Sequence, residues 1–136
     1  MTPLLYARIS YVALALSTIA LGLIVHWHGN ALGPTWRDVA GDATWAAMIA
    51  WWVAALVPSA SLRRRALVAL AICVAVEVSQ LFHTPALDTL RGTTAGHLVL
   101  GSGFDPRDLV AYTLGVLAAG VLERSVRRRV QGTPPA

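Results

Sequence analysis

The chain has 136 residues, of which 56% are hydrophobic and 13% are charged. A soluble domain of this length cannot bury so much apolar surface, so the composition excludes an ordinary soluble protein and predicts an integral membrane protein. The formal net charge of +4 would also suit nucleic acid, but the arginines gather beside apolar segments, at 63–65 and 124–129. That placement favours topology signals and membrane lipids as partners, and argues against nucleic acid.

Four apolar segments follow one another along the chain, and they predict an all-α fold, a bundle of four transmembrane helices. The predicted spans are residues 9–27, 39–57, 66–83 and 106–123. At about 1.5 Å per residue, each comes close to the roughly 30 Å thickness of a bilayer core. We predict one four-span domain over residues 1–130, followed by a short disordered tail at 131–136.

The arginines also predict an orientation, because four spans leave both termini on the same side of the membrane. Arg8 and the two arginine clusters then share the side of the termini, which becomes the cytoplasmic one. In the opposite loops, acids balance the arginines: Arg37, Arg91 and Arg107 against Asp38, Asp42, Asp88 and Asp105. We therefore expect a multi-pass protein of the cell membrane with both termini in the cytoplasm.

Small residues recur at helical spacing in the second and fourth spans. The rows are Ala43, Ala46, Ala47, Ala50 and Ala54 in the second span, and Ala111, Gly115 and Ala119 in the fourth. Such rows let helix backbones approach closely in lipid, where the hydrophobic effect no longer drives helices together. They predict a compact bundle, and they leave open a second use as a homodimer face.

Between the third and fourth spans lies an outer segment of about 22 residues, from Thr84 to Asp105. It is too long for a tight turn, and long connections without a role are uncommon. Its middle, residues 95–100, is apolar but much too short to span a membrane. We expect a re-entrant or interfacial piece that covers the polar residues of the third span.

Glu77 and Gln80 are the polar residues inside the third span. They lie three positions apart, so a helix presents them on one face. An ionisable side chain within a membrane span is a functional-site hypothesis by default. The structural alternative is that the two side chains only hydrogen-bond neighbouring helices and fix their packing.

The fourth span opens with the sequence Asp105-Pro106-Arg107-Asp108. Asp105 can cap the helix, and Pro106 suits its first position, so helix capping explains these two residues without a further function. Asp108 has Tyr112 one turn later on the same face. We predict that Asp108 faces Glu77 across an outer cavity and that Tyr112 belongs to the same site.

Two residues of the outer segment complete the predicted ligand-binding set. Arg91 can neutralise the acids or hold an anionic group through its planar fork, although an exposed arginine at headgroup level would look the same. His97 can contact a ligand, shuttle a proton or make a loop hydrogen bond. No metal is expected, because Glu77, His83, His97 and Asp108 match no known ligand spacing. No cofactor is expected either.

These residues also carry a family resemblance. They form the strings Glu77-Val78-Ser79-Gln80-Leu81-Phe82, Arg91-Gly92-Thr93, Gly96-His97-Leu98 and Gly103-Phe104-Asp105, with Asp108, Tyr112 and Gly115 following. The chain resembles, over residues 65–120, small bacterial membrane proteins of unknown function related to the VanZ-like proteins. VanZ-like sequences pair Glu-x-x-Gln with Asp-x-x-x-Asn-x-x-Gly, and Tyr112 stands where that pattern has Asn. The resemblance implies a cell-envelope setting without naming a reaction.

Three hypotheses for function follow from the sequence. The first is an outward-facing polar pocket that binds an amphipathic envelope ligand, a lipid or a cell-wall precursor, with Glu77, Gln80, Arg91, His97, Asp108 and Tyr112 as its site. The alternatives are a small proton- or cation-coupled transporter element and a structural membrane partner. No nucleophile, P-loop or nucleotide fingerprint stands out, so whether a reaction is catalysed stays open.

Overall fold

The computed structural model describes residues 2–101 and 103–131, with side chains as far as Ser125. These residues form helices and connecting turns without any strand, so the predicted all-α class is confirmed for the described part of the chain. The helices are α1 (Pro3–His28), the short 3-10 helix η1 (Gly29–Leu32), α2 (Pro34–Leu56), α3 (Leu62–Ser79), α4 (Pro85–Arg91), α5 (Thr94–Leu100) and α6 (Pro106–Gln131).

Each helix begins at a start signal in the sequence. Proline is the first residue of α1, α2, α4 and α6. The side chains of Thr2, Ser61, Thr84 and Thr93 accept hydrogen bonds from backbone N–H groups in the first turns of α1, α3, α4 and α5. A helix leaves its first N–H groups without partners, and proline has no N–H to leave unpaired, so these residues fix where the helices start.

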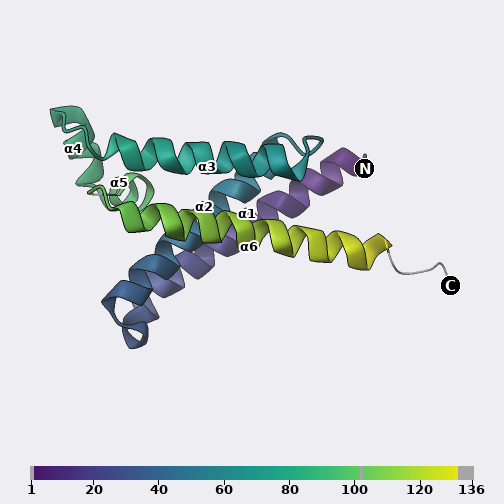
Figure 1. The fold of residues 1–136 in the computed structure, drawn as a ribbon, viewed down its shortest axis with the longest axis horizontal. Coiled ribbons are helices and arrows are strands. Elements are labelled where there is room, and N and C mark those ends of the chain that lie inside the picture. Colours follow the sequence, from purple (N-terminus) through teal and green to yellow (C-terminus); the bar gives the residue numbers. More distant parts are fainter. Residues whose placement is uncertain (1, 102, 132–136) are drawn as a thin grey trace.

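The four long helices run back and forth along the molecule (Figure 1). The start of α1, the α2–α3 connection and the end of α6 lie toward one end, and α4 and α5 lie at the other. Helix α2 is central, because it packs against α1, α3 and α6, while α3 and α6 also contact each other. We call the end near the α2–α3 connection the terminal end, and the end carrying α4 and α5 the cap end.

Alanines make up much of the interior, together with a few large side chains such as Trp51 and Tyr112, and many large apolar residues cover the outside. Ala15, Ala46 and Ala69 are fully buried, whereas leucine, isoleucine and valine side chains point outward from every long helix, among them Leu16, Ile24, Leu56, Leu67, Leu117 and Val121. A Cβ atom on Gly115 of α6 would overlap the backbone of Ala43 in α2. The rows of small residues therefore do bring helices α2 and α6 into close contact, as the sequence predicts.

The helices differ from the predicted spans mainly at their ends. Helix α2 starts at Pro34 instead of residue 39, and α3 covers residues 62–79 instead of 66–83. The outer segment is not structureless, because threonine caps and Pro85 start two short helices within it. Helix α6 continues to Gln131, and the rest of the predicted tail, residues 132–136, lies outside the described residues.

Two helical segments of the described chain are long and apolar enough to cross a membrane, Pro3–Leu32 and Pro34–Leu56. The sequence predicts four. Helix α3 has only 18 residues and carries three arginines near its start and Glu77 near its end, which lowers its mean hydropathy. Length and composition therefore support a membrane protein through α1 and α2, and they do not by themselves establish four spans.

Candidate functional site

Glu77 lies near the end of α3 and is fully buried, with 0% of its surface exposed. Its Oε1 accepts a hydrogen bond of 2.7 Å from the backbone N–H of Asp105. Its Oε2 accepts one of 2.9 Å from the Tyr112 hydroxyl and one of 3.1 Å from the Gln80 amide. Three neutral donors thus satisfy both oxygens, an arrangement that suits an ionised carboxylate.

The start of α6 contributes two of these donors. The Asp105 side chain accepts a hydrogen bond of 2.9 Å from the Arg107 backbone N–H, so it caps α6 as its position before Pro106 predicts. The Asp105 backbone N–H is left to bind Glu77. The positive end of a helix dipole favours a carboxylate at this place. On the outer side, hydrogen bonds from the Arg107 side chain hold the pKa of Asp105 below its ordinary value.

The segment after α5 covers the site from the cap end. Gly101 adopts a φ of +66°, a left-handed conformation that glycine reaches without a steric cost. A Cβ atom there would lie 2.6 Å from Nε2 of Gln80, so the backbone approaches this side chain more closely than any other residue type allows. The segment after α5 thus lies against Gln80 of α3, and its re-entrant or interfacial placement stays a prediction.

Asp108 and Asp42 form a second pair of acids beside Glu77. Their side chains, on α6 and α2, are hydrogen-bonded to each other, and Glu77 interacts electrostatically with both. A carboxyl–carboxyl hydrogen bond needs a proton on one of the two groups. The sequence predicts Asp108 here, but it counts Asp42 with the acids of the outer loops, although residue 42 lies just inside the predicted second span; in the structure Asp42 belongs to α2.

These residues surround a cleft of about 790 Å³ at the cap end. Its walls come from α1, α2, α3, α5, α6 and the turn before α6. Asp42, Asp108, Gln80, His97 and Tyr112 line it together with apolar side chains, including Ile19, Leu23, Met48, Val76 and Leu98. Of the six predicted ligand-binding residues, Gln80, His97, Asp108 and Tyr112 therefore face the cleft, and Glu77 lies behind Gln80 and Tyr112.

Arg91, the sixth residue, has a different position. Its guanidinium donates hydrogen bonds of 2.9 and 2.8 Å to the backbone carbonyls of Phe82 and Ser79, and it lies 3.7 Å from the Asp88 carboxylate. A basic side chain at the end of a helix satisfies carbonyls that have no partner within the helix. Arg91 ties α4 to the end of α3 and is not among the residues that line the cleft.

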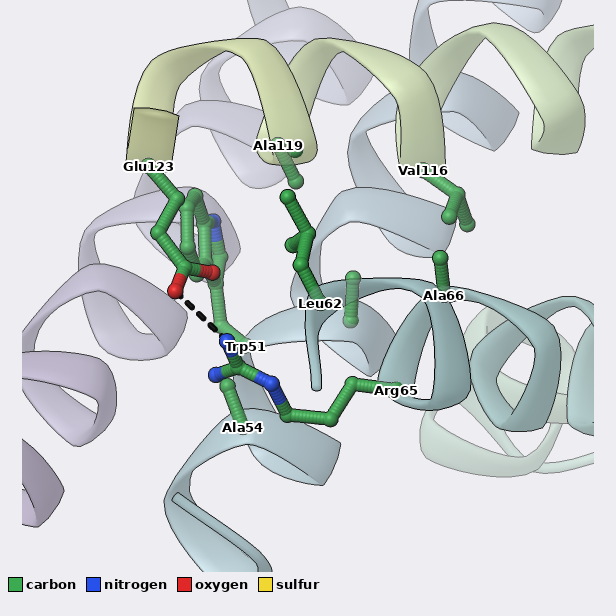
Figure 2. A pocket seen from close by; sticks show the side chains of 10 residues that line it. Trp51, Ala54, Leu62, Arg65, Ala66, Val116, Ala119 and Glu123 are labelled. Atoms are coloured by element: carbon green, nitrogen blue, oxygen red, sulfur yellow. Dashed lines mark hydrogen bonds and ion pairs between the residues drawn. The ribbon is translucent and has the colours of Figure 1, made fainter. Parts of the chain in front are cut away.

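A second buried carboxylate lies at the terminal end. Glu123 of α6 accepts hydrogen bonds of 2.6 Å from the Arg65 guanidinium and 2.8 Å from the Tyr11 hydroxyl. Figure 2 shows Arg65 reaching from α3 toward Glu123, beside Trp51. Arg65 is 3% exposed and Glu123 is 7% exposed. The sequence assigns Arg65 to an exposed basic cluster, and nothing in the spacing of residues 65 and 123 reveals the pair.

The arrangement at the cap end is suited to binding more clearly than to catalysis. Its groups can donate and accept hydrogen bonds and hold charge. Cys73, the one cysteine of the chain, is fully buried in the core between α2, α3 and α6. Among the described residues, no group of three His, Cys, Asp or Glu side chains is placed to hold a metal ion.

A family model described as "Protein of unknown function (DUF2809)" matches residues 32–116. The chain belongs to this family. The matched part runs from the end of η1 into α6, so it contains Asp42, Glu77, Asp108 and Tyr112. Of the ion pair at the terminal end, it contains Arg65 but not Glu123. No solved structure matches the chain. The match to DUF2809 includes the acids and Tyr112 of the cap end but not the α1 wall of the cleft, and it gives the cleft no function.

Proposed function

We propose that this DUF2809 protein spans the membrane four times and binds an amphipathic ligand in the cap-end cleft. The distribution of apolar residues supports the membrane setting. Side chains such as Leu16 and Leu117 are more than half exposed, while alanines make up much of the core. Large exposed apolar faces around a core of small residues are expected when lipid surrounds a helical bundle.

Burial of the charged groups supports α3 and α6 as the third and fourth spans. Glu77 has hydrogen-bond donors on both oxygens, and Arg65 forms an ion pair with Glu123. None of these three side chains is exposed to surrounding lipid. The exposed Arg63 and Arg64 lie in the first turn of α3, where long side chains can reach the headgroup region.

The single observation that carries the proposed function is the cleft itself. At about 790 Å³ it has the volume of a small-molecule site, and its walls combine apolar side chains with a few convergent polar groups. A ligand that fits such walls has an apolar part and a polar head, as a membrane lipid or a lipid-linked cell-wall precursor does. Because the arginine-rich terminal end favours the cytoplasm, we place the cleft toward the outside, in keeping with the VanZ-like resemblance.

Gly41 of α2 offers a direct test, because it lines the cleft and a Cβ atom there would meet no other atom within 4 Å. In Gly41→Trp the indole ring would fill part of the cleft without displacing the backbone. Gly41→Ala is the matched control, since it adds the same Cβ and little volume. The measurement is native mass spectrometry of both variants and wild type, released from their own lipids into a neutral detergent.

We expect a discrete adduct on wild type and Gly41→Ala, and its loss from Gly41→Trp at unchanged thermal stability. The mass of the adduct would identify the ligand class. Equal adducts on all three proteins, or none on wild type while the helical signal and stability remain intact, would contradict a binding function for the cleft.

The hydrogen-bonded pair of Asp42 and Asp108 favours a second candidate, a proton- or cation-coupled transporter element. Such a pair on the wall of an open cleft could exchange a proton with solvent. This candidate predicts ion or proton flux in sealed vesicles that contain the protein, and loss of that flux in Asp108→Asn. Vesicles as tight as protein-free ones would leave ligand binding as the function to pursue.

A further inference from the structure

The charged groups at the rim of the cleft are already paired with one another. Arg107 makes hydrogen bonds of 2.6 to 3.1 Å with the Asp105 carboxylate. Arg37 donates a hydrogen bond of 3.1 Å to Asn30 and lies 3.9 Å from Asp38. These arginines are the two cations that line the cleft apart from histidines, so little positive charge is left at the rim for an anionic head group.

The inner wall has the opposite balance. Asp42 and Asp108 interact with each other, and neither has an ion pair with an arginine or histidine among the described residues. Glu77 adds a third carboxylate directly behind them and is also held by neutral donors. The inner wall is therefore an acidic surface without a direct ion pair to a protein cation in the described part of the chain; Arg107 interacts with Asp108 only electrostatically, while its hydrogen bonds go to Asp105.

Aromatic rings stand next to these acids. Trp45 and Tyr112 both line the cleft, with ring centroids 5.4 Å apart. The Trp45 indole N–H is buried and has no hydrogen-bond partner among the described residues. Aromatic faces attract organic cations, and an unsatisfied N–H favours a ligand with an oxygen acceptor near its head.

The same geometry distinguishes an organic cation from a metal ion. The described residues offer no cluster of three metal-ligating side chains, whereas an ammonium group needs only acceptors for its N–H donors and a surface for its carbon atoms. Carboxyl groups on two facing helices can accept from one ammonium. The apolar part of the cleft, formed by residues such as Leu23 and Met48, then accommodates a hydrocarbon chain.

We propose that the cleft selects an amphipathic molecule with a primary amine head, held between Asp42 and Asp108. This inference rests on the proposed function and specifies the head group of its ligand. It predicts that charge, at constant chain length, decides which amphiphile binds. Neutral and anionic amphiphiles are the alternatives that the experiment must separate.

Wild-type protein in a neutral maltoside detergent would be titrated separately with dodecylamine, dodecanol and dodecanoate, and bound molecules counted by native mass spectrometry. These probes share one chain and differ in the head group. We expect one dodecylamine per chain, bound at least about tenfold more tightly than dodecanol, because hydrogen bonds between charged groups are stronger than those between neutral groups. Dodecanoate should bind most weakly, since its own negative charge would face the carboxyl groups of the inner wall.

Asp42→Asn and Asp108→Asn should each reduce the preference for the amine about tenfold or more. Asp88→Asn is the matched control, because Asp88 lies on α4, is not among the residues that line the cleft, and has a side chain that is 48% exposed. That control should keep the wild-type preference. Thermal unfolding of each variant would verify that the bundle is folded, and the selectivity of the wild type provides a test that needs no variant.

The two proposals fail in different ways. If dodecylamine and dodecanol bind equally and Gly41→Trp blocks both, the cleft binds amphiphiles but the amine inference is wrong. Stronger binding of dodecanoate would also overturn it, in favour of an anionic ligand. If none of the three probes binds to folded wild type, both the amine inference and the proposed amphiphile site are contradicted.

Discussion

The two buried carboxylates of this bundle are stabilised in different ways. At the terminal end, Glu123 meets the Arg65 guanidinium at 2.6 Å, and positive charge balances negative charge inside the protein. At the cap end, Glu77 is equally buried but meets a backbone amide, a phenol and a side-chain amide. Two further carboxyls, those of Asp42 and Asp108, interact with it.

This difference suggests a structural role for the terminal end and a ligand-binding role for the cap end. Glu123 and Arg65 neutralise each other, and the cavity beside them has only about 20 Å³, enough for about one water molecule. At the cap end, Asp42, Glu77 and Asp108 have no direct ion pair among the described residues, and they lie next to a cleft of about 790 Å³. A cationic ligand would balance the negative charge of the carboxylates at the cap end, as Arg65 balances the charge of Glu123 at the terminal end.

The largest predicted effect comes from breaking the terminal ion pair. Arg65→Met would remove the Arg65 guanidinium from the buried Glu123 carboxylate, and removal of one partner of a buried pair typically costs about 3–5 kcal/mol of unfolding free energy. The double variant Arg65→Met with Glu123→Leu should recover most of that loss, because it removes both charges. Unfolding in mixed micelles, followed by circular dichroism, measures the free energy of each protein.

A loss in the double variant as large as in Arg65→Met would show that the packing of the arginine stem, and not the charge pair, stabilises the terminal end. Either way, the cleft is remote from these residues. The adduct that wild type retains in the Gly41→Trp experiment should therefore also be present on Arg65→Met and on the double variant, provided that the variant folds.

A smaller loss is expected when the charge at the cap end is removed. Glu77→Gln keeps the shape of the side chain and removes the charge itself. However, the new amide NH₂ group must replace one of the two carboxylate oxygens, and both of these oxygens accept hydrogen bonds from donors. We expect a loss of about 1–3 kcal/mol, because the change exchanges hydrogen bonds to a carboxylate for weaker or unmade ones. The same micelle unfolding measurement gives the value.

Tyr112→Phe is the control for this prediction, since it removes one of the three donors and leaves the carboxylate. Its loss should be smaller than that of Glu77→Gln. A loss in Glu77→Gln that exceeds the loss in Arg65→Met would invert the comparison and assign the main structural role to the cap end.

Much of the fold was predictable because helix signals are local. Pro106 starts α6 as predicted, and the alanine rows mark the contact between α2 and α6, whereas Pro34 starts α2 five residues before the predicted span. The close contact at Gly115 follows from the same rows. The number of spans was less secure, because the hydropathy of α3 depends on charged residues whose partners lie on other helices.

The candidate site was predictable only in part for the same reason. Glu77, Asp108 and Tyr112 stand out because polar residues are rare in apolar segments, and the structure brings them together. Asp42 was missed because it was counted with the acids of the outer loops as a balance to nearby arginines, whereas α2 starts at Pro34 and places Asp42 on the wall of the cleft. Arg65 and Glu123 are 58 residues apart, and no periodic pattern connects two residues at such a separation.

The smallest predicted effect concerns Asp105, whose backbone binds Glu77 while its side chain binds Arg107. Hydrogen bonds from Arg107 lower the pKa of Asp105 in the folded protein. The charge of Asp105 therefore contributes stability above the pKa of the unfolded chain, about 3.9, and that contribution is lost as the pH falls through the lower folded value. Because Arg107 is 78% exposed, solvent screens the pair and the contribution is small.

Asp105→Asn isolates this contribution, since asparagine still caps a helix but cannot titrate. Between pH 7 and pH 3, wild type should lose slightly more unfolding free energy than Asp105→Asn, with the remaining acids common to both. Added salt should narrow the difference at pH 7. Equal pH dependence in the two proteins would mean that Asp105 acts through its backbone N–H and its cap alone, so that Arg107 contributes no net charge stabilisation at the cap end.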